Sequence, residues 1–128
     1  MKTILRKIFI TLLLRIVGEN YCIVENKNRN FFIVCQEIER YYNIRLDIIL
    51  SPSRKRYICE SRQMLQVLAR KHTTLHKSEI GRLTKRDHCA VIHAEKTIKD
   101  LMATDEKIAT DYSILNKRIK RRIINLDI

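Results

Sequence analysis

Apolar residues recur at intervals of three and four along most of the chain, a spacing typical of amphipathic helices. One such stripe, near the C-terminus, consists of Ile108, Tyr112, Leu115 and Ile119. Comparable stripes predict helices over residues 31–42, 46–50, 61–72, 78–83 and 88–103, before a last helix that Thr104-Asp105 opens. The pattern therefore predicts a chain made mainly of short helices.

The polar residues between the stripes predict where these helices begin and end. Asn30 is the expected N-cap of the first helix, and Asn43 its left-handed terminator. Residues 51–53, Ser-Pro-Ser, should stop the second helix. Ser78 and Asp87 are expected to open the two helices that follow the helix over 61–72.

The first 30 residues differ from the rest. Residues 1–17 form an apolar arm with a basic start and helical spacing, too short to span a bilayer and followed by no small-residue cleavage site. Residues 18–30 are polar and Asn-rich, with a candidate short strand at 21–24. We expect an arm and linker over 1–30, a helical domain over 31–116 and a basic tail over 117–128, which either contacts phosphate or is solvated.

Glycine and proline are scarce, which narrows the fold class. The 128 residues include two glycines and one proline, fewer than hairpins and bulges usually need. A chain of this length suits one domain with a modest core. We therefore expect an all-α fold, a small helical bundle.

Positive charge is concentrated in the middle of the chain. The formal net charge is +12, and residues 54–86 carry ten Lys or Arg against two acids. Such a concentration is typical of proteins that bind a polyanion. Nucleic acid is the favoured partner, with a membrane surface and plain solubility as the alternatives.

The residues typical of catalysis or metal binding are not grouped. The four cysteines include no C-x-x-C pair, so we expect reduced thiols and no metal site. No Ser-His-Asp set or paired carboxylates stand out, which predicts no enzyme and no cofactor. Aromatic residues make up 6% of the chain, which disfavours a single-strand binder that stacks bases.

Residues 78–94 read S-E-I-G-R-L-T-K-R-D-H-C-A-V-I-H-A, a short helix, a turn and a longer helix. This order is that of a helix-turn-helix, in which Ile80 and Val91 would pack together and Gly81 would permit close approach. The second helix of such a motif presents its first residues to base edges in the major groove. Those residues are Asp87, His88, Cys89, Ala90 and, one turn further, His93. From the pattern alone, surface histidines and a simple helix cap remain equally open.

The segment I-G-R-L-T-K-R-D-H-C-A-V-I-H-A resembles the signature of the C-terminal DNA-binding domain of the bacterial replication initiator DnaA, roughly I-G-x-x-F-G-x-R-D-H-[ST]-T-V-x-H-A. The resemblance extends over about residues 31–115, through Y-Y-N-I-R-L-D-I-I-L and S-R-Q-M-L-Q-V-L-A-R. It implies a fold of the Trp-repressor and DnaA C-terminal type. It also implies that one monomer binds one asymmetric duplex box of the TTATCCACA type.

The resemblance implies a role for each matching residue. Asp87, His88, Cys89, Ala90 and His93 would face the major groove, and Arg54 would reach into the minor groove. The residues that would hold phosphates are Arg56, Arg62, Gln63, Lys77, Ser78, Lys85 and Arg86.

Two departures from the signature and one missing motif change the expectation. Cys89-Ala90 replaces Ser/Thr-Thr, so one hydroxyl donor is lost. The turn before Arg86 is one residue shorter than in the signature. The chain also contains no G-x-x-x-x-G-K-[ST] motif, so we expect no ATP-driven initiator.

These observations predict a protein that binds DnaA-box-like sites on double-stranded DNA, with an accessory role in replication initiation or its regulation. The alternative is a protein-interaction module that recruits or blocks a replication protein, or associates with itself, through residues 1–17. A nuclease or transposase fragment would need a carboxylate cluster for metal. We expect a cytoplasmic, nucleoid-associated protein without membrane association. By analogy alone, because a small detached domain suits accessory regulation, we expect it to come from a phage or another mobile element.

Overall fold

The computed structural model describes the backbone of residues 25–127 and the side chains of residues 29–125. The expected arm over 1–17, the strand at 21–24 and Cys22 lie outside this part. The described part contains helices and no strand, which confirms the all-α expectation. The helices are α2 (Glu25–Tyr42), α3 (Leu46–Ile49), α4 (Arg56–His72), α5 (Lys77–Leu83), α6 (His88–Thr104) and α7 (Glu106–Asp127).

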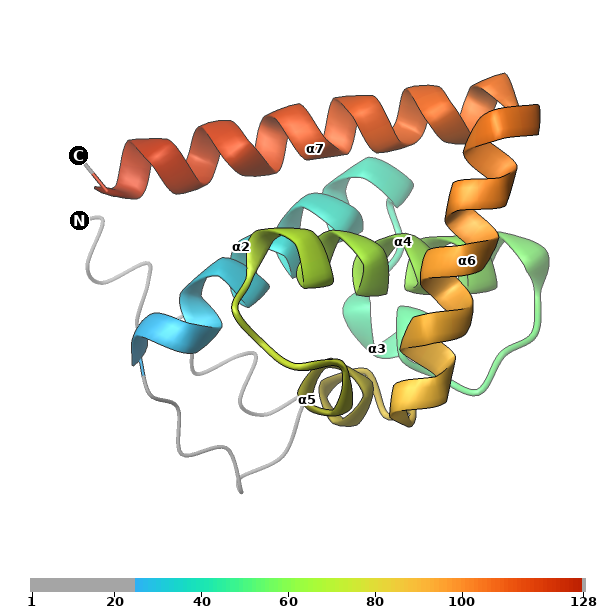
Figure 1. Cartoon of the computed structure of the whole chain (residues 1–128), viewed down its shortest axis with the longest axis horizontal. Helices are drawn as coiled ribbons and strands as arrows, with labels where there is room; N and C mark the ends of the chain where they lie inside the picture. The colour runs from blue at the N-terminus through green and yellow to red at the C-terminus, as the bar shows by residue number, and fades with distance from the viewer. Residues whose placement is uncertain (1–24, 128) are drawn as a thin grey trace.

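The helices pack around one hydrophobic core. Helix α4 contacts α2 and α6, while α7 crosses α2 and the C-terminal half of α6. Fully buried side chains from all six described helices meet in this core, including Ile38, Leu65, Ile98 and Leu115. Each such side chain contributes about 1.5–3 kcal/mol relative to an exposed one. Figure 1 shows α7 along one edge of the bundle, with α5 and the N-terminus of α6 at the opposite edge.

The predicted N-terminal boundary of the first described helix, residue 31, was wrong by six residues. Helix α2 begins at Glu25, so Asn30 lies inside it and does not cap it. The Asn30 side chain instead donates a hydrogen bond to the carbonyl of His72 (3.2 Å), at the C-terminal end of α4. That carbonyl has no partner within its own helix, so the Asn30 amide satisfies it from α2. The capping preference of asparagine does not predict this tertiary contact. The terminator Asn43 is confirmed, with φ of 53°.

Helix α4 also begins earlier than predicted, at Arg56 instead of Ser61. The additional turn is held from two sides. The hydroxyl of Tyr57 donates to the carbonyl of Tyr42 at the end of α2, and Ser61 donates to the carbonyl of Ile58 (2.7 Å). The irregular strip expected at 54–56 therefore loses Arg56 to the helix.

The last helix continues through the segment expected as a tail. Helix α7 extends to Asp127, and Ile119 is fully buried in the core. Arg122 donates to the carboxylate of Glu37 (2.9 Å) and to the side-chain oxygen of Gln36 (2.5 Å), both on α2. The basic residues after 116 thus belong to an ordered helix that packs on α2.

Among the helices described, none is both long enough and apolar enough to cross a membrane.

Candidate nucleic-acid interface

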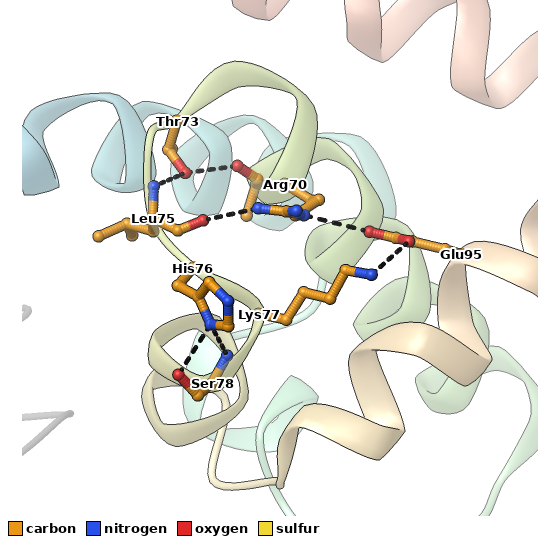
Figure 2. Close-up of polar contacts among 8 residues, drawn as sticks. Arg70, Thr73, Leu75, His76, Lys77, Ser78 and Glu95 are labelled. Atoms are coloured by element: carbon orange, nitrogen blue, oxygen red, sulfur yellow. Dashed lines mark hydrogen bonds and ion pairs between the residues drawn. The ribbon is translucent and has the colours of Figure 1, made fainter.

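Helix α5 begins at Lys77 because the preceding residue caps it. The Nδ1 atom of His76 accepts a hydrogen bond from the backbone N–H of Ser78 (3.3 Å). Ser78 was expected to be the cap, and this prediction was wrong. A histidine whose neutral ring nitrogen faces the helix satisfies the same free N–H group that a serine hydroxyl would. Figure 2 shows this ring turned toward the first turn of α5.

The turn between α5 and α6 closes tightly against Gly81. The N–H of Arg86 donates to the carbonyl of Gly81 (2.7 Å). A Cβ atom at residue 81 would lie 2.6 Å from the carbonyl oxygen of Asp87, closer than any real contact. Gly81 therefore permits the close approach that the sequence predicted, and Ile80 and Val91 are both fully buried beneath it.

Two buried polar side chains fix the turn from inside. The hydroxyl of Thr84 donates to the carbonyl of Ile80 (2.8 Å) and accepts from the amide of Gln66 on α4 (3.0 Å). Lys85 then takes a left-handed conformation, with φ of 57°. Gln66 and Thr84 were not singled out in the sequence, since a glutamine on an apolar helix gives no sign of its partner.

The first turn of α6 is capped and exposed. The carboxylate of Asp87 accepts from the N–H of Ala90 (3.0 Å), as predicted for the N-cap. Asp87, His88, Cys89 and His93 are exposed, and Ala90 is half-buried. The rings of the two histidines make one side-chain contact each, to the Cys89 sulfur (3.6 Å) and to the Thr97 hydroxyl (3.4 Å). Five residues with polar or small side chains thus lie together on one exposed helix end.

Arg62 of α4 binds the segment between α3 and α4, residues 50–55, through backbone carbonyls. Nε of Arg62 donates to the carbonyl of Ile49 (2.8 Å), and one terminal nitrogen donates to those of Ser51 (2.6 Å) and Ser53 (3.0 Å). Arg62 has a relative exposure of only 9%. Its guanidinium donates to protein carbonyls and so has a structural role. Its contact with phosphate stays a prediction.

Arg86 joins this segment to the helix-turn-helix. Its guanidinium donates to the same Ser51 carbonyl (2.8 Å) that Arg62 uses. Burial lowers the pKa of Arg62, and the nearby charge of Arg86 lowers it further. Arg54 and Arg56 are exposed beside this junction. The segment that carries Arg54 and the turn before α6 are therefore fastened to each other.

Lys77 lies at an acidic contact on the other side of the motif. Glu95 of α6 is 3.5 Å from Nε of Arg70 and 4.0 Å from Nζ of Lys77. Figure 2 shows the Glu95 carboxylate between these two cations, which come from α4 and α5. Arg70 also donates to the carbonyl of Leu75 (3.2 Å), in the loop before α5. All three contributing side chains are partly exposed, so each ion pair is worth about 1 kcal/mol or less.

The predicted site residues fall into two groups. One group lies at the exposed end of α6, its turn and the neighbouring segment, and consists of Arg54, Arg56, Arg62, Lys85, Arg86, Asp87, His88, Cys89, Ala90 and His93. The other consists of Lys77 and Ser78, which stand at the start of α5, and of Gln63, which lies on α4. Ser51, His76 and Glu95 contribute contacts that the sequence did not indicate. Within the described residues no three His, Cys, Asp or Glu side chains gather as metal ligands.

A short helix, a tight glycine-dependent turn and a capped second helix define a protein of the helix-turn-helix class. The chain belongs to the family described as the bacterial DnaA protein helix-turn-helix, which matches residues 33–98. This match covers the turn, the exposed end of α6 and the segment that carries Arg54.

Proteins named chromosomal replication initiator protein DnaA are similar to most of this chain. The one from Caldanaerobacter subterraneus subsp. tengcongensis is 38% identical over 100 residues, 77% of this chain and 23% of the relative. The one from Cereibacter sphaeroides is 37% identical over 93 residues, 69% of this chain and 20% of the relative. The one from Ruegeria pomeroyi is 39% identical over 93 residues, again 69% and 20%. The chain spans less than a quarter of the length of these relatives.

Proposed function

We propose that this chain binds double-stranded DNA at DnaA-box-like sequences, with the exposed end of α6 in the major groove and Arg54 in the minor groove. Membership of the helix-turn-helix family supports binding to DNA. The observation that carries the finer proposal is the shared Ser51 carbonyl. Arg62 and Arg86 both bond to it, so the two reading elements are held in one fixed relation.

The chemistry of the α6 end suits base reading. Neutral histidine carries one donor and one acceptor nitrogen, so His88 and His93 can each meet a base edge. Asp87 uses one carboxylate oxygen for its cap and keeps the other for a cytosine amino group. The helix N-terminus also favours a nearby phosphate.

The phosphate contacts are proposed for the cations that surround this end. Arg56, Lys85 and Arg86 flank it, and Lys77 lies with Ser78 at the start of α5. Lys77 would exchange Glu95 for a phosphate at little cost, because the present pair is partly exposed. We assign Arg62 to positioning the Arg54 segment.

Cys89-Ala90 should change the sequence preference. A methyl contact to thymine remains possible through Ala90, whereas the hydroxyl donor of a serine or threonine is gone. One good base contact is worth about 1–3 kcal/mol of discrimination. We therefore expect this chain to prefer the TTATCCACA box less strongly than a protein that carries Ser/Thr-Thr, or to prefer a variant of it.

His88→Ala and Lys77→Ala test the two kinds of contact against each other. His88→Ala should reduce the preference for the box over a scrambled duplex, whereas Lys77→Ala should weaken binding to both duplexes alike. Lys99→Ala serves as a matched control, because Lys99 is an exposed cation on α6 beyond the capped turns. If His88→Ala left all relative affinities unchanged, α6 would not be the reading helix.

The alternative function is a protein-interaction module with weak, sequence-blind DNA binding. The loss of the hydroxyl donor at Cys89-Ala90 is the feature that favours it. This reading predicts equal affinity for box and scrambled duplexes, together with a stable protein partner or self-association that needs residues 1–17.

We further propose an accessory role at replication origins or promoters, in the cytoplasm and on the nucleoid. Occupation of the same boxes by this chain and by the DnaA relatives would let it compete with them or mark the site. Addition of the chain to an origin-bound initiator distinguishes these roles: competition displaces the initiator, and marking leaves both proteins bound.

A further inference from the structure

Helix α7 carries a second basic surface, which the proposed box binding does not use. Lys117, Lys120 and Arg121 are exposed on consecutive turns and define what we call the α7 basic face. From residue 107 to residue 125 the only acid is Asp111. Asp111 is buried (5% relative exposure) and accepts a hydrogen bond from the hydroxyl of Tyr41, so its charge is withdrawn from this face.

The neighbouring cations explain why these three are available. Arg122 is engaged by Glu37 and Gln36, and Arg118 lies over the ring of Tyr41 (5.9 Å). Across the described residues, no carboxylate comes within ion-pair distance of Lys117, Lys120 or Arg121.

One more cation extends the face toward α4. Lys71, in the last turn of α4, donates to the hydroxyl of Tyr112 on α7 (3.2 Å). Burial lowers the pKa of His72, and the nearby charges of Lys71 and Lys120 lower it further. Positive charge therefore collects where α7 crosses the end of α4, and no carboxylate among the described side chains forms an ion pair with Lys71 or Lys120.

The α7 basic face lies far from the reading end of α6. Helix α6 has 17 residues and leads from the capped turn at Asp87 directly to α7, and a helix of that length spans about 25 Å. Figure 1 shows α7 running away from the C-terminal end of α6, along the edge opposite α5. A duplex seated on the start of α6 cannot also reach Lys117, Lys120 and Arg121 unless it bends sharply.

We propose that the α7 basic face binds the phosphate backbone of a second DNA segment, so that one chain bridges two duplexes. The inference rests on the proposed box binding at the other end of the molecule. Cations three and four residues apart are about 5 Å apart along a helix, and each strand of duplex DNA offers one phosphate per about 3.4 Å of helix axis. This second contact is sequence-blind and depends steeply on salt.

A bridging assay tests the inference. A duplex with the box is fixed to beads, the chain is added, and retention of a labelled scrambled duplex is measured. The test variant carries Lys117→Gln, Lys120→Gln and Arg121→Gln. The control removes three other exposed charges, Arg45→Gln, Lys99→Gln and Lys107→Gln. Circular dichroism and urea unfolding establish that both variants are folded.

The wild type and the control should retain the labelled duplex. The amount retained by the test variant should be at least tenfold lower. Binding of a single short box duplex should change less than twofold in the test variant. Loss of three phosphate contacts should also reduce the slope of log affinity against log salt for the second duplex by about 2.7.

Three results would overturn the inference. The first is that the wild type saturates with one duplex per chain. The second is that the test variant and the control bridge equally, as they would through self-association. The third is that the chain binds vesicles of anionic phospholipid but no second duplex. If box and scrambled duplexes bound alike, the proposed function would fail. The inference about the α7 basic face could still be tested then, because the test variant should bind less DNA in total than the wild type.

Discussion

Replacement of Arg62 by lysine separates a structural role from a phosphate contact, because the positive charge is kept. Three of the hydrogen bonds that Arg62 donates go to the carbonyls of Ile49, Ser51 and Ser53, at 2.6–3.0 Å. A lysine has one nitrogen and cannot reproduce the fork, so it can keep one of these bonds.

The magnitude follows from the bonds that are lost. A hydrogen bond to a charged group contributes about 1.5–3 kcal/mol. Two are lost, but Ser51 and Ser53 are only half-buried, so water replaces part of the interaction. We therefore expect Arg62→Lys to lower the free energy of unfolding by about 2–3 kcal/mol. DNA affinity should also fall several-fold, because the segment that carries Arg54 is no longer held.

Urea unfolding followed by circular dichroism measures the first effect, and duplex binding at fixed salt measures the second. Arg56→Lys is the matched control: Arg56 is exposed, and its replacement should change stability by about 0.5 kcal/mol or less. If Arg62→Lys were as stable as the wild type, the fork would not hold the segment. If Arg62 acted mainly through phosphate, the lysine variant would keep both its stability and most of its affinity.

Three further predictions concern the turn, the half-buried His72 and the reading face. Gly81→Ala places a Cβ 2.6 Å from the carbonyl oxygen of Asp87, and overpacking of about 1–3 kcal/mol should outweigh the gain in helix propensity of about 1 kcal/mol; a variant at least as stable as the wild type in urea would contradict the close approach. Burial lowers the pKa of His72 from 6.5, so the unfolded chain binds the proton more readily than the folded chain. Stability should therefore fall as the pH drops below about 6.5 toward the folded pKa. His72→Gln should flatten the dependence of stability on pH in this window, and an unchanged dependence would mean that another group causes it. Cys89 is exposed and Cys35 is buried, so maleimide should label Cys89 first in a Cys22→Ser background, and a box duplex should slow that labelling; labelling at the same rate with and without the duplex would remove Cys89 from the interface.

The helix interiors follow from the sequence because the apolar stripes alone decide which face is buried. The buried positions Val91, Ala94 and Ile98 of α6 and Ile108 and Leu115 of α7 lie on the predicted stripes. Local signals succeeded where the side chain acts on its own backbone. Asn43 in the left-handed region is one case, and the Asp87 cap is another.

The helix starts could not be predicted in the same way, because the partner of each polar side chain comes from elsewhere in the fold. Asn30 reads as a cap but bonds to His72, 42 positions away. Histidine is not among the residues preferred at an N-cap, yet His76 caps α5. Tyr57 donates a hydrogen bond to the end of α2 and so extends α4 at its N-terminus. In each case a tertiary contact outweighs the local preference.

The candidate site divides along the same line. The α6 residues from Asp87 to His93 could be selected by motif, since their spacing is local. Arg62 could be selected as a cation but not as the residue that holds residues 50–55, because the Ser51 carbonyl leaves no trace in a sequence. Gln66 was missed for the same reason, since its partner Thr84 is 18 residues away.

The central claim is that the end of α6 reads the sequence of duplex DNA. The most direct measurement is the affinity of the whole chain for a labelled TTATCCACA duplex and for a scrambled duplex at several salt concentrations, with His88→Ala beside the wild type. The account predicts that the wild type prefers one sequence at every salt concentration, the box itself or a variant found by random-sequence selection, and that His88→Ala loses this preference. Equal binding to all duplexes by the wild type, after selection as well, would contradict it.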